Sequence, residues 1–338
     1  MTSPLLLTVI LNYRTPEMTL AAIAAALREM EGIAGEIVVV ENGSGDGSFE
    51  VLEAWIAEAG WPCGRVTLLR SNHNGGFGAG NNIGLRHGLS DGRAPDYVYL
   101  LNSDAQPEPG AIRALLDYME AAPKVGIAGS YLHGVDDDPH QSAFRFPTIA
   151  GELEGAARTG VITKALKHAV IPFEITETPI AVDWVAGASA LFRRAVLDEI
   201  GLFDETFFLY FEETDLCLRA KRAGWQVHYV PASRVLHIGS VSTGMKAWAR
   251  TPGYWFDSRL HYFRKNHGAG YAALATLARA FGAAIWRLRV WLQGKPLGDP
   301  PHFLADMLRH ALRAAFHLGP RRGARAPEPT KPLIREDT

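Results

Sequence analysis

The sequence predicts an α/β protein with a mostly parallel, twisted sheet and helices on both faces. Three observations predict this class. Apolar segments rich in β-branched residues alternate four times with segments of helical periodicity, which is typical of parallel strands joined by right-handed crossovers. Polar residues follow each apolar segment directly. The 338 residues are 47% apolar and 21% charged, a composition that excludes disordered, collagen-like and coiled-coil proteins.

The first half of the chain holds the four repeating units, each a strand followed by a helix. We expect strands at 5–11, 36–40, 66–69 and 97–101, and helices at 17–30, 48–59, 78–89 and 109–120. Ligands of such sheets bind at the carboxyl ends of the strands. One crevice should therefore gather the residues after each strand, which are Asn12-Tyr13-Arg14, Glu41-Asn42-Gly43-Ser44, Asn72-His73-Asn74-Gly75-Gly76 and Asn102-Ser103-Asp104.

The second half is less regular. Residues 130–180 are rich in turn formers, which predicts a long excursion with short helices. Further on, we expect strands at 180–185, 189–192, 227–230 and 234–237, and a helix at 213–223 closed by Gly224. Helical patterns then cover 269–292 and 302–318, and the tail from Gly319 is rich in Pro, Arg and Gly, which predicts disorder.

Charge is distributed unevenly along the chain. The net charge is only −2, so no basic field favours a nucleic-acid partner. Residues 1–267 hold 23 Lys and Arg against 31 Asp and Glu, whereas residues 268–338 hold 11 against 5. We therefore predict a globular domain over 1–267 with halves 1–129 and 130–267, a helical extension over 268–318, and a disordered tail over 319–338.

The start of the chain predicts a cytoplasmic protein. Residues 1–17 lack the basic segment and small-residue cleavage site of a secretory signal. No window has the roughly 18 to 20 uncharged apolar residues that a membrane span requires. Cys63 and Cys217, the two cysteines, cannot form a disulfide framework or a Cys-rich zinc site.

Asp104 is the first candidate for chemistry, because it directly follows an apolar strand. Mg²⁺ and Mn²⁺ bind oxygen ligands and commonly take one or two carboxylates together with phosphate oxygens. Asp104 could thus hold a metal on a diphosphate, and His237, at the end of another strand, is a second candidate ligand. The alternatives are that Asp104 caps the helix near Pro109 and that His237 is structural.

The segment Asn74-Gly75-Gly76-Phe77-Gly78-Ala79-Gly80-Asn81-Asn82 places backbone N–H groups at the start of a helix, where an anion can bind. A dinucleotide-binding G-x-G-x-x-G pattern is interrupted by Asn81, and no phosphate-binding G-x-x-x-x-G-K-[ST] motif occurs. Alternatively, the glycines only permit a tight turn.

Three carboxylates begin the helix expected after residue 211: Glu212, Glu213 and Asp215. The helix dipole favours their ionised form, so at least one should be a competent base at neutral pH. Glu212 and Asp215 are three residues apart and should share a helical face, with Glu213 pointing elsewhere. The alternative is that all three are ordinary acidic residues of a helix start.

Taken in order, the motifs resemble those of family 2 glycosyltransferases of the GT-A fold, a Rossmann-like architecture. The resemblance is strongest to the bacterial rhamnosyltransferase-like subgroup and covers residues 5–267. It rests on ILNY, VVVENGSGDGS, NHNGGFGAGNNIGL, LLNSDA, VDWVAGASALFRR, FFLYFEETDLCLRAKRAGW and HIGSVST. It implies that 1–129 is the nucleotide-sugar-binding half and 130–267 the acceptor and catalytic half.

The resemblance also implies roles for single positions. The donor pocket would be lined by Asn12, Tyr13, Glu41, Asn42, Gly76, Phe77, Asn81 and Asn82. Asn102-Ser103-Asp104 replaces the family's D-x-D motif, so Asp104, helped by His237, would hold Mg²⁺ or Mn²⁺. The acceptor side would contain Asp183, Trp184, Gly187 and Glu212. Glu213 would be the catalytic base, with Asp215 as the alternative.

The implied reaction is an inverting transfer of a sugar, L-rhamnose by analogy with the subgroup, from a nucleoside-diphosphate sugar. The acceptor would be a hydroxyl of a cell-envelope glycan or a lipid-linked saccharide. Two other functions compete with this one. A sugar-nucleotide nucleotidyltransferase should show a glycine-rich basic loop after the first strand, but residues 12–17 contain no glycine. A non-catalytic nucleotide-sugar-binding module would explain the departures at Asn102 and Glu213.

The extension over 268–318 supports two hypotheses. In the first, it attaches the protein peripherally to the inner face of the cell membrane through apolar residues and arginines. In the second, its helices pack on the catalytic domain or on a second subunit of a homodimer. The residues concerned are Tyr271, Leu274, Leu277, Phe281, Ile285, Trp286, Leu288, Val290, Trp291 and Leu292, with Arg279, Arg287 and Arg289.

Overall fold

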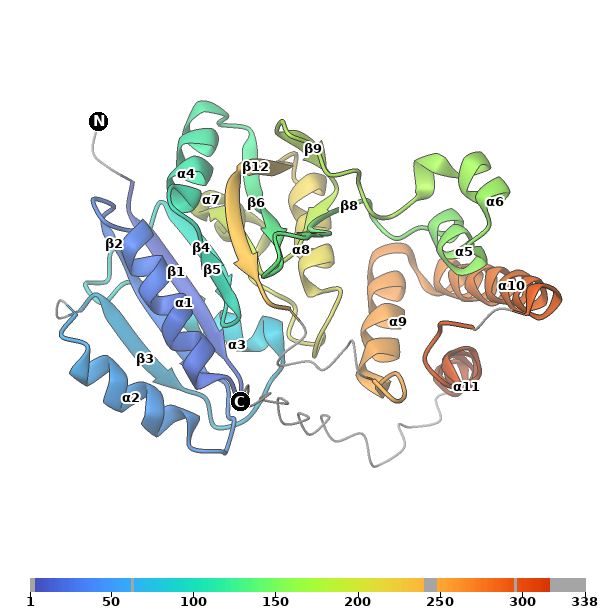
Figure 1. The fold of residues 1–338 in the computed structure, drawn as a ribbon, viewed down its shortest axis with the longest axis horizontal. Helices are drawn as coiled ribbons and strands as arrows, with labels where there is room; N and C mark the ends of the chain where they lie inside the picture. The colour runs from blue at the N-terminus through green and yellow to red at the C-terminus, as the bar shows by residue number, and fades with distance from the viewer. Residues whose placement is uncertain (1–3, 62–63, 240–247, 295–296, 317–338) are drawn as a thin grey trace.

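The computed structural model describes residues 4–61, 64–239, 248–294 and 297–316. Within these residues, one ten-stranded sheet has the order β3-β2-β1-β4-β11-β6-β12-β5, with β7 on β6 and β9 on β12 (Figure 1). The strands are β1 Leu6–Asn12, β2 Gly35–Glu41, β3 Val66–Arg70, β4 Tyr97–Asn102, β5 Ala105–Pro107, β6 Val125–His133, β7 Pro139–His140, β9 Ile180–Val182, β11 Ser189–Arg193 and β12 Gln226–His237. A small second sheet pairs β8 Ala143–Phe144 with β10 Trp184–Val185.

The four expected strand–helix units are confirmed. β1, β2, β3 and β4 pair in parallel, with β1 between β2 and β4. Helices cover both faces of the sheet, so residues of β1 such as Leu6 and Val9 are fully buried. The helices are α1 Pro16–Glu29, α2 Ser48–Glu58, α3 Phe77–His87, α4 Ala111–Ala121, α7 Arg194–Ile200 and α8 Glu212–Arg222.

The sheet changes direction at β11, which is antiparallel to both β4 and β6. Two expectations for this part were wrong. β6 was not expected as a strand, although it is almost entirely buried. The strands expected at 227–230 and 234–237 are one strand, β12, with a register shift between Val230 and Arg234. Pro231 lies at the shift and has no N–H for the ladder, which explains the break in periodicity.

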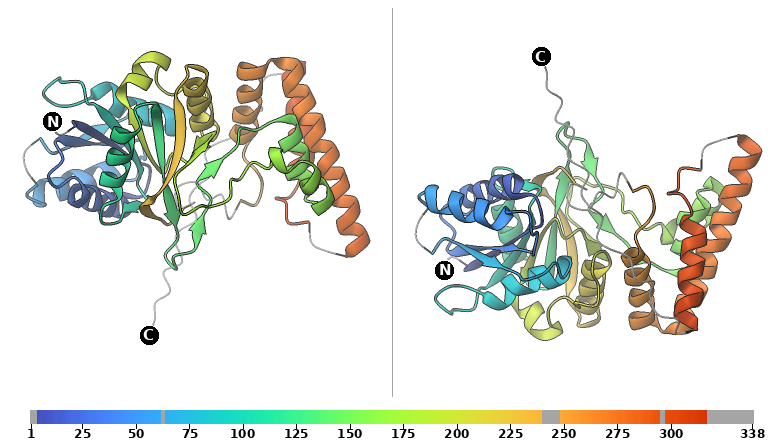
Figure 2. Two further views of the ribbon diagram at one scale, coloured as in Figure 1. Left: turned by 90° about the horizontal axis from the view of Figure 1, so that it is seen from above. Right: turned by 90° about the horizontal axis from the view of Figure 1, so that it is seen from below.

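A second group of helices lies beside the sheet (Figures 1 and 2). They are α5 Ile149–Ala157, α9 Gly253–His267, α10 Ala269–Gln293 and α11 Phe303–Ala315, and the short α6 Gly160–Ala165 follows α5. α10 packs on α5 and α9, so the excursion of the chain after β8 supports the C-terminal extension. Among the described helices, none has the length and hydropathy needed to cross a membrane. The tail expected to be disordered lies outside the described residues.

Candidate active site

A cavity of about 610 Å³ opens where β1 and β4 end, next to the first turns of α3 and α8. This volume is in the range of sites for ligands the size of a nucleotide. Of the expected site residues, the cavity is lined by Tyr13, Asn42, Gly76, Phe77, Asn102, Ser103, Asp104, Trp184, Gly187, Glu212, Glu213 and His237. The strand-end residues of β1, β2 and β4 and the loop after β3 thus meet at one site, as the topology predicts.

Asp104 is held beside His237 by strand pairing. β5 and β12 pair so that Ala105 lies opposite His237, and the peptide N–H of Ile238 donates to the carbonyl oxygen of Asp104 at 3.1 Å. The Oδ1 atom of Asp104 lies 3.3 Å from Nε2 of His237, and its Oδ2 accepts from the N–H of Gly239 at 3.1 Å. Asp104 is only 7% exposed, so the position of its carboxylate is fixed before any ligand arrives.

Asp104 and His237 form an incomplete ligand set for a divalent cation. Among the residues that the structure describes, no three His, Cys, Asp or Glu side chains are grouped as a metal site. Mg²⁺ typically keeps several waters and binds through one or two carboxylates plus substrate phosphates, and imidazole is an acceptable ligand for Mn²⁺. The two side chains therefore fit a metal that is completed by a bound diphosphate, rather than a closed protein site.

Two adjacent glutamates begin α8, on the same cavity. Tyr210 and Phe211, just before them, both have left-handed backbone angles, with φ of 71° and 70°. This conformation costs free energy in residues with a side chain, and it turns the chain sharply so that Glu212 and Glu213 both reach the cavity. The expectation that Glu212 shares a face with Asp215, away from Glu213, was therefore wrong.

The two glutamates lie where their carboxylates are poorly solvated. The Oε2 atoms of both Glu212 and Glu213 are buried without a hydrogen-bond partner among the described residues. Burial, together with the nearby charge of Glu213, raises the pKa of Glu212 well above its ordinary value. Burial also raises the pKa of Glu213. Burial thus outweighs the helix dipole, and a carboxylate with a raised pKa is a stronger base.

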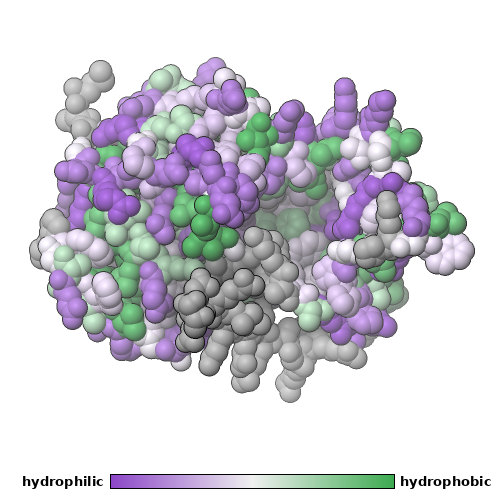
Figure 3. All heavy atoms as spheres, viewed as in Figure 1, coloured by the Kyte–Doolittle hydropathy of each residue, from purple (hydrophilic) through white to green (hydrophobic). Residues whose placement is uncertain are grey.

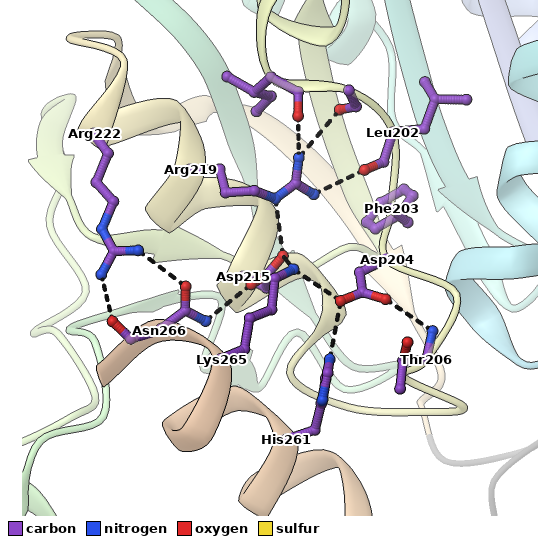
Figure 4. Close-up of polar contacts among 12 residues, drawn as sticks. Leu202, Phe203, Asp204, Thr206, Asp215, Arg219, Arg222, His261, Lys265 and Asn266 are labelled. Carbon is purple, nitrogen blue, oxygen red and sulfur yellow. Dashed lines mark hydrogen bonds and ion pairs between the residues drawn. The ribbon is translucent and has the colours of Figure 1, made fainter. Parts of the chain in front are cut away.

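Asp215 lies outside the cavity lining, in a network of charged residues (Figure 4). Its fully buried carboxylate accepts from Arg219 Nε at 2.9 Å, Lys265 Nζ at 2.7 Å and Asn266 Nδ2 at 2.9 Å. Lys265 also bridges to Asp204 at 2.8 Å. These contacts occupy both oxygens of Asp215 and attach α8 to α9, so the structure argues against Asp215 as the alternative base.

Four residues expected in the donor pocket are absent from the cavity lining and instead hold the surrounding loops. Asn12 Oδ1 accepts from the Thr19 hydroxyl at 2.8 Å, and Glu41 Oε1 accepts from the Ser44 N–H at 2.7 Å. The amide groups of Asn81 and Asn82 donate to the carbonyl oxygens of Phe77 and Phe203. All four residues are buried and do not line the cavity, so their roles in the donor pocket stay predictions.

Gly76 shows why the loop after β3 needs glycine. Its φ is +91°, and a Cβ atom built there would lie 1.8 Å from the carbonyl oxygen of Phe208. That same oxygen accepts from the N–H of Phe77 at 2.9 Å. The close approach joins the start of α3 to the segment before α8, so the two walls of the cavity are held together.

On the side expected to face the acceptor, Trp184 stacks on Phe144 with ring centroids 4.1 Å apart. Asp183, by contrast, accepts from the N–H of Phe146 at 3.0 Å and pairs with Lys221, and it does not line the cavity. Several lining residues were not predicted from the sequence: His140, Gln141, Phe144, Phe208, Tyr210 and Tyr254. Most come from segments of weak periodicity, where only the local abundance of aromatic residues could have indicated a site.

Comparison with solved structures establishes the fold. A mannosyltransferase from Pyrobaculum calidifontis in complex with GDP-Man and Mn²⁺ superimposes with a TM-score of 0.58 at 14% identity, covering 93% of this chain and 88% of that one. GalNAc-T7 with UDP, GalNAc and Mn²⁺ superimposes with a TM-score of 0.57 at 14% identity, covering 91% of this chain and 55% of that one. The fold is therefore that of the GT-A glycosyltransferases.

The chain belongs to family 2 of these enzymes, since the family described as "Glycosyltransferase like family 2" matches residues 4–264. The N-acetylglucosaminyl-diphospho-decaprenol L-rhamnosyltransferase of Mycobacterium tuberculosis is 32% identical over 220 residues, which cover 62% of this chain and 68% of that protein. The rhamnosyltransferase WbbL of Escherichia coli K12 is 28% identical over 165 residues, covering 48% and 60%. These findings confirm the resemblance seen in the sequence.

Proposed function

We propose that this glycosyltransferase moves L-rhamnose, or a related hexose, from a nucleoside-diphosphate sugar to a hydroxyl of a lipid-linked saccharide or cell-envelope glycan, with inversion. One observation carries the proposal: Asp104, after β4, and Glu213, on α8, line the same cavity. The names of the relatives from M. tuberculosis and E. coli support the rhamnosyl donor, and the former supports a diphospho-polyprenol-linked acceptor.

In the proposed mechanism, Glu213 accepts the proton of the acceptor hydroxyl. The hydroxyl oxygen bonds to the anomeric carbon while the bond from that carbon to the diphosphate oxygen breaks, and the nucleoside diphosphate leaves. Asp104 and His237 would hold Mg²⁺ or Mn²⁺ against the diphosphate. When bound, such a metal neutralises the charge that grows on the leaving group.

The remaining lining residues would bind the two substrates. Tyr13 and Asn42 stand at the ends of β1 and β2, where the nucleoside of a GT-A donor would lie, and Gly76 with Phe77 would border the same pocket. Trp184 offers a flat apolar ring for the face of an acceptor sugar, and Gly187 leaves space beside it. We also propose a location on the cytoplasmic face of the cell membrane, where a polyprenol-linked acceptor would be available.

A thermal-shift panel of sugar nucleotides tests donor choice, because a ligand of the folded state raises apparent stability by mass action. We expect the largest rise with a nucleoside-diphosphate rhamnose plus Mn²⁺, and a smaller rise for the Asp104→Asn variant, whose proposed metal site has lost its carboxylate. Transfer to a diphospho-polyprenol-linked N-acetylglucosamine acceptor is then measured with the best donor. A panel in which no sugar nucleotide shifts the melting temperature would overturn the proposal.

A further inference from the structure

One face of α10 is exposed and wholly apolar. We call it the α10 stripe, defined by Ala273, Leu274, Leu277, Phe281, Ala284, Leu288, Trp291 and Leu292, all of which are exposed. The large side chains are far from covered: Leu277 is 61% exposed, Phe281 64% and Trp291 76%. At a rise of about 1.5 Å per residue, the stripe runs for about 30 Å along the helix. Monomeric soluble proteins rarely leave so long an apolar surface open.

The opposite face of α10 is firmly attached to the molecule. A Cβ atom on Gly282 would lie 2.6 Å from the carbonyl oxygen of Leu153 in α5, which shows how closely the helices approach. The carboxylate of Glu152 in α5 is buried and pairs with Arg259 at 2.8 Å and with Arg279 at 3.2 Å. The stripe is therefore presented on a fixed helix at the end of the molecule farthest from β3 (Figures 1 and 2).

The packing of α10 corrects the membrane-binding surface that was predicted from the sequence. Arg279 points inward to Glu152 and cannot meet a headgroup. Val290 is buried, Trp286 donates its ring N–H to the carbonyl oxygen of Leu297 at 2.9 Å, and the hydroxyl of Tyr271 accepts from the N–H of Ile149 at 3.3 Å. The surface that remains is narrower, and it contains no charged residue.

Arginines flank the stripe. Arg287 and Arg289 precede and follow Leu288, so they lie about 100° to either side of it around the helix. Neither has a carboxylate partner among the described residues. One Nη atom of Arg289 donates to the carbonyl oxygen of Arg158 at 2.9 Å, and the Nε atom of Arg287 is buried without a hydrogen-bond partner there. The described acidic residues of the extension, Asp299 and Asp306, already pair with Arg158 and Arg250. Over 268–338 the chain carries 11 Lys and Arg against 5 Asp and Glu, so the region is cationic.

A second copy of the chain is the competing occupant. Leu274, Phe281 and Leu288 are seven residues apart, as are Leu277, Ala284 and Trp291, which is the spacing of a coiled coil. Coiled coils choose their partner through opposite charges that flank this seam. The flanking positions here contain only apolar residues and one arginine, namely Ala273, Ala280 and Arg287 on one side and Ala278, Ile285 and Leu292 on the other. An apolar surface flanked by positive charge matches the apolar, anionic surface of a membrane better than it matches a second copy of the same positively charged surface.

We propose that the α10 stripe binds the surface of a membrane rich in anionic lipids, with α10 lying in the plane of the interface. Leu277, Phe281 and Trp291 would enter the boundary between headgroups and acyl chains, and Arg287 and Arg289 would contact lipid phosphates. On the face seen in Figure 3, hydrophobic residues drawn in green lie among hydrophilic ones at the edge formed by the C-terminal helices. The inference does not depend on the donor, acceptor or catalytic residues proposed above.

Co-sedimentation of the full chain with vesicles tests the inference. We expect the wild-type protein to sediment with vesicles of phosphatidylcholine and phosphatidylglycerol, and much less with phosphatidylcholine alone. Leu277→Gln with Phe281→Gln should lower the partition coefficient at least about tenfold, because two large apolar side chains are lost from the interface. Arg287→Gln with Arg289→Gln should lower it roughly fivefold per arginine at low salt, and added salt should reduce this difference.

Matched controls substitute exposed side chains of the same kind elsewhere. Trp55→Gln on α2, where Trp55 is 57% exposed, and Arg113→Gln on α4 should leave vesicle binding unchanged. Equal melting temperatures of all variants exclude unfolding as the cause of a loss. The inference is overturned if the stripe variant binds vesicles as well as wild type does. It is also overturned if sedimentation equilibrium shows a wild-type dimer that the stripe variant dissociates while neither protein binds vesicles.

Discussion

Two groups of carboxylates at the start of α8 have opposite surroundings. Glu212 and Glu213 line the cavity, have no cationic partner in the described structure, and have raised pKa values because they are buried. Two residues further on, Asp215 is bound by Arg219 and Lys265, and Lys265 joins it to Asp204 (Figure 4). One short segment thus supplies both the proposed proton acceptor and a structural anchor. Arg219, one turn further along α8, and Lys265 from α9 make the difference.

The largest expected effect is on catalysis, at Glu213. Glu213→Gln keeps the shape of the side chain but cannot accept a proton, so kcat should fall by about 10² to 10⁴-fold, the usual contribution of a general base. The melting temperature should not fall, because the substitution removes a poorly solvated carboxyl group. Initial rates of sugar transfer, with thermal unfolding in parallel, measure both. A variant that keeps wild-type kcat would show that another group is the base.

The second effect is on stability, at Asp215. Asp215→Asn leaves Arg219 and Lys265 near a neutral group, and breaking one partner of a buried charge network costs about 3 to 5 kcal/mol. Urea unfolding should show this loss in the free energy of unfolding. Glu212→Gln is the matched substitution on the same helix turn, and it should not reduce stability at neutral pH. Equal destabilisation by both variants would remove the contrast between the two groups.

The third effect concerns pH and Glu212. Because its pKa is raised in the folded state, the folded protein binds more protons than the unfolded chain between pH 4.5, the ordinary pKa, and the raised pKa. Stability contributed by this group is therefore lost as pH rises through that window. Glu212→Gln should remove this loss, so its stability relative to wild type should grow from about pH 4.5 upward. Denaturant unfolding at a series of pH values measures it.

The smallest effect has the opposite sign and concerns Asp204. Burial alone would raise its pKa, but hydrogen bonds from His261, Lys265 and Thr206 lower it below its ordinary value of 3.8. The stability from this carboxylate is therefore complete above pH 3.8 and is lost as pH falls below it. His261→Gln should cost about 0.5 to 1.5 kcal/mol and move acid unfolding to higher pH. An unchanged acid midpoint, followed by circular dichroism, would contradict this role of His261.

The regions that the sequence predicted correctly are those with local causes. The periodicity of 5–120 determines the four strand–helix units, and parallel topology then brings Tyr13, Asn42 and Asp104 to one cavity without further information. The start of α8 is likewise marked by its acidic first turn. In each case neighbours within a few residues, together with one general rule of sheet topology, are sufficient.

The tertiary structure decided which polar side chains face the cavity. Asn82 and Asp183 belong to the expected motifs, yet Asn82 donates to the carbonyl oxygen of Phe203 and Asp183 pairs with Lys221. Both partners are more than 30 residues away in sequence. Asp215 became an anchor because Lys265 reaches it from α9, and Arg279 turned inward because Glu152 is buried beneath α10. Such pairings depend on contacts between distant segments, and the residue types alone do not determine which carboxylate is left without a cation.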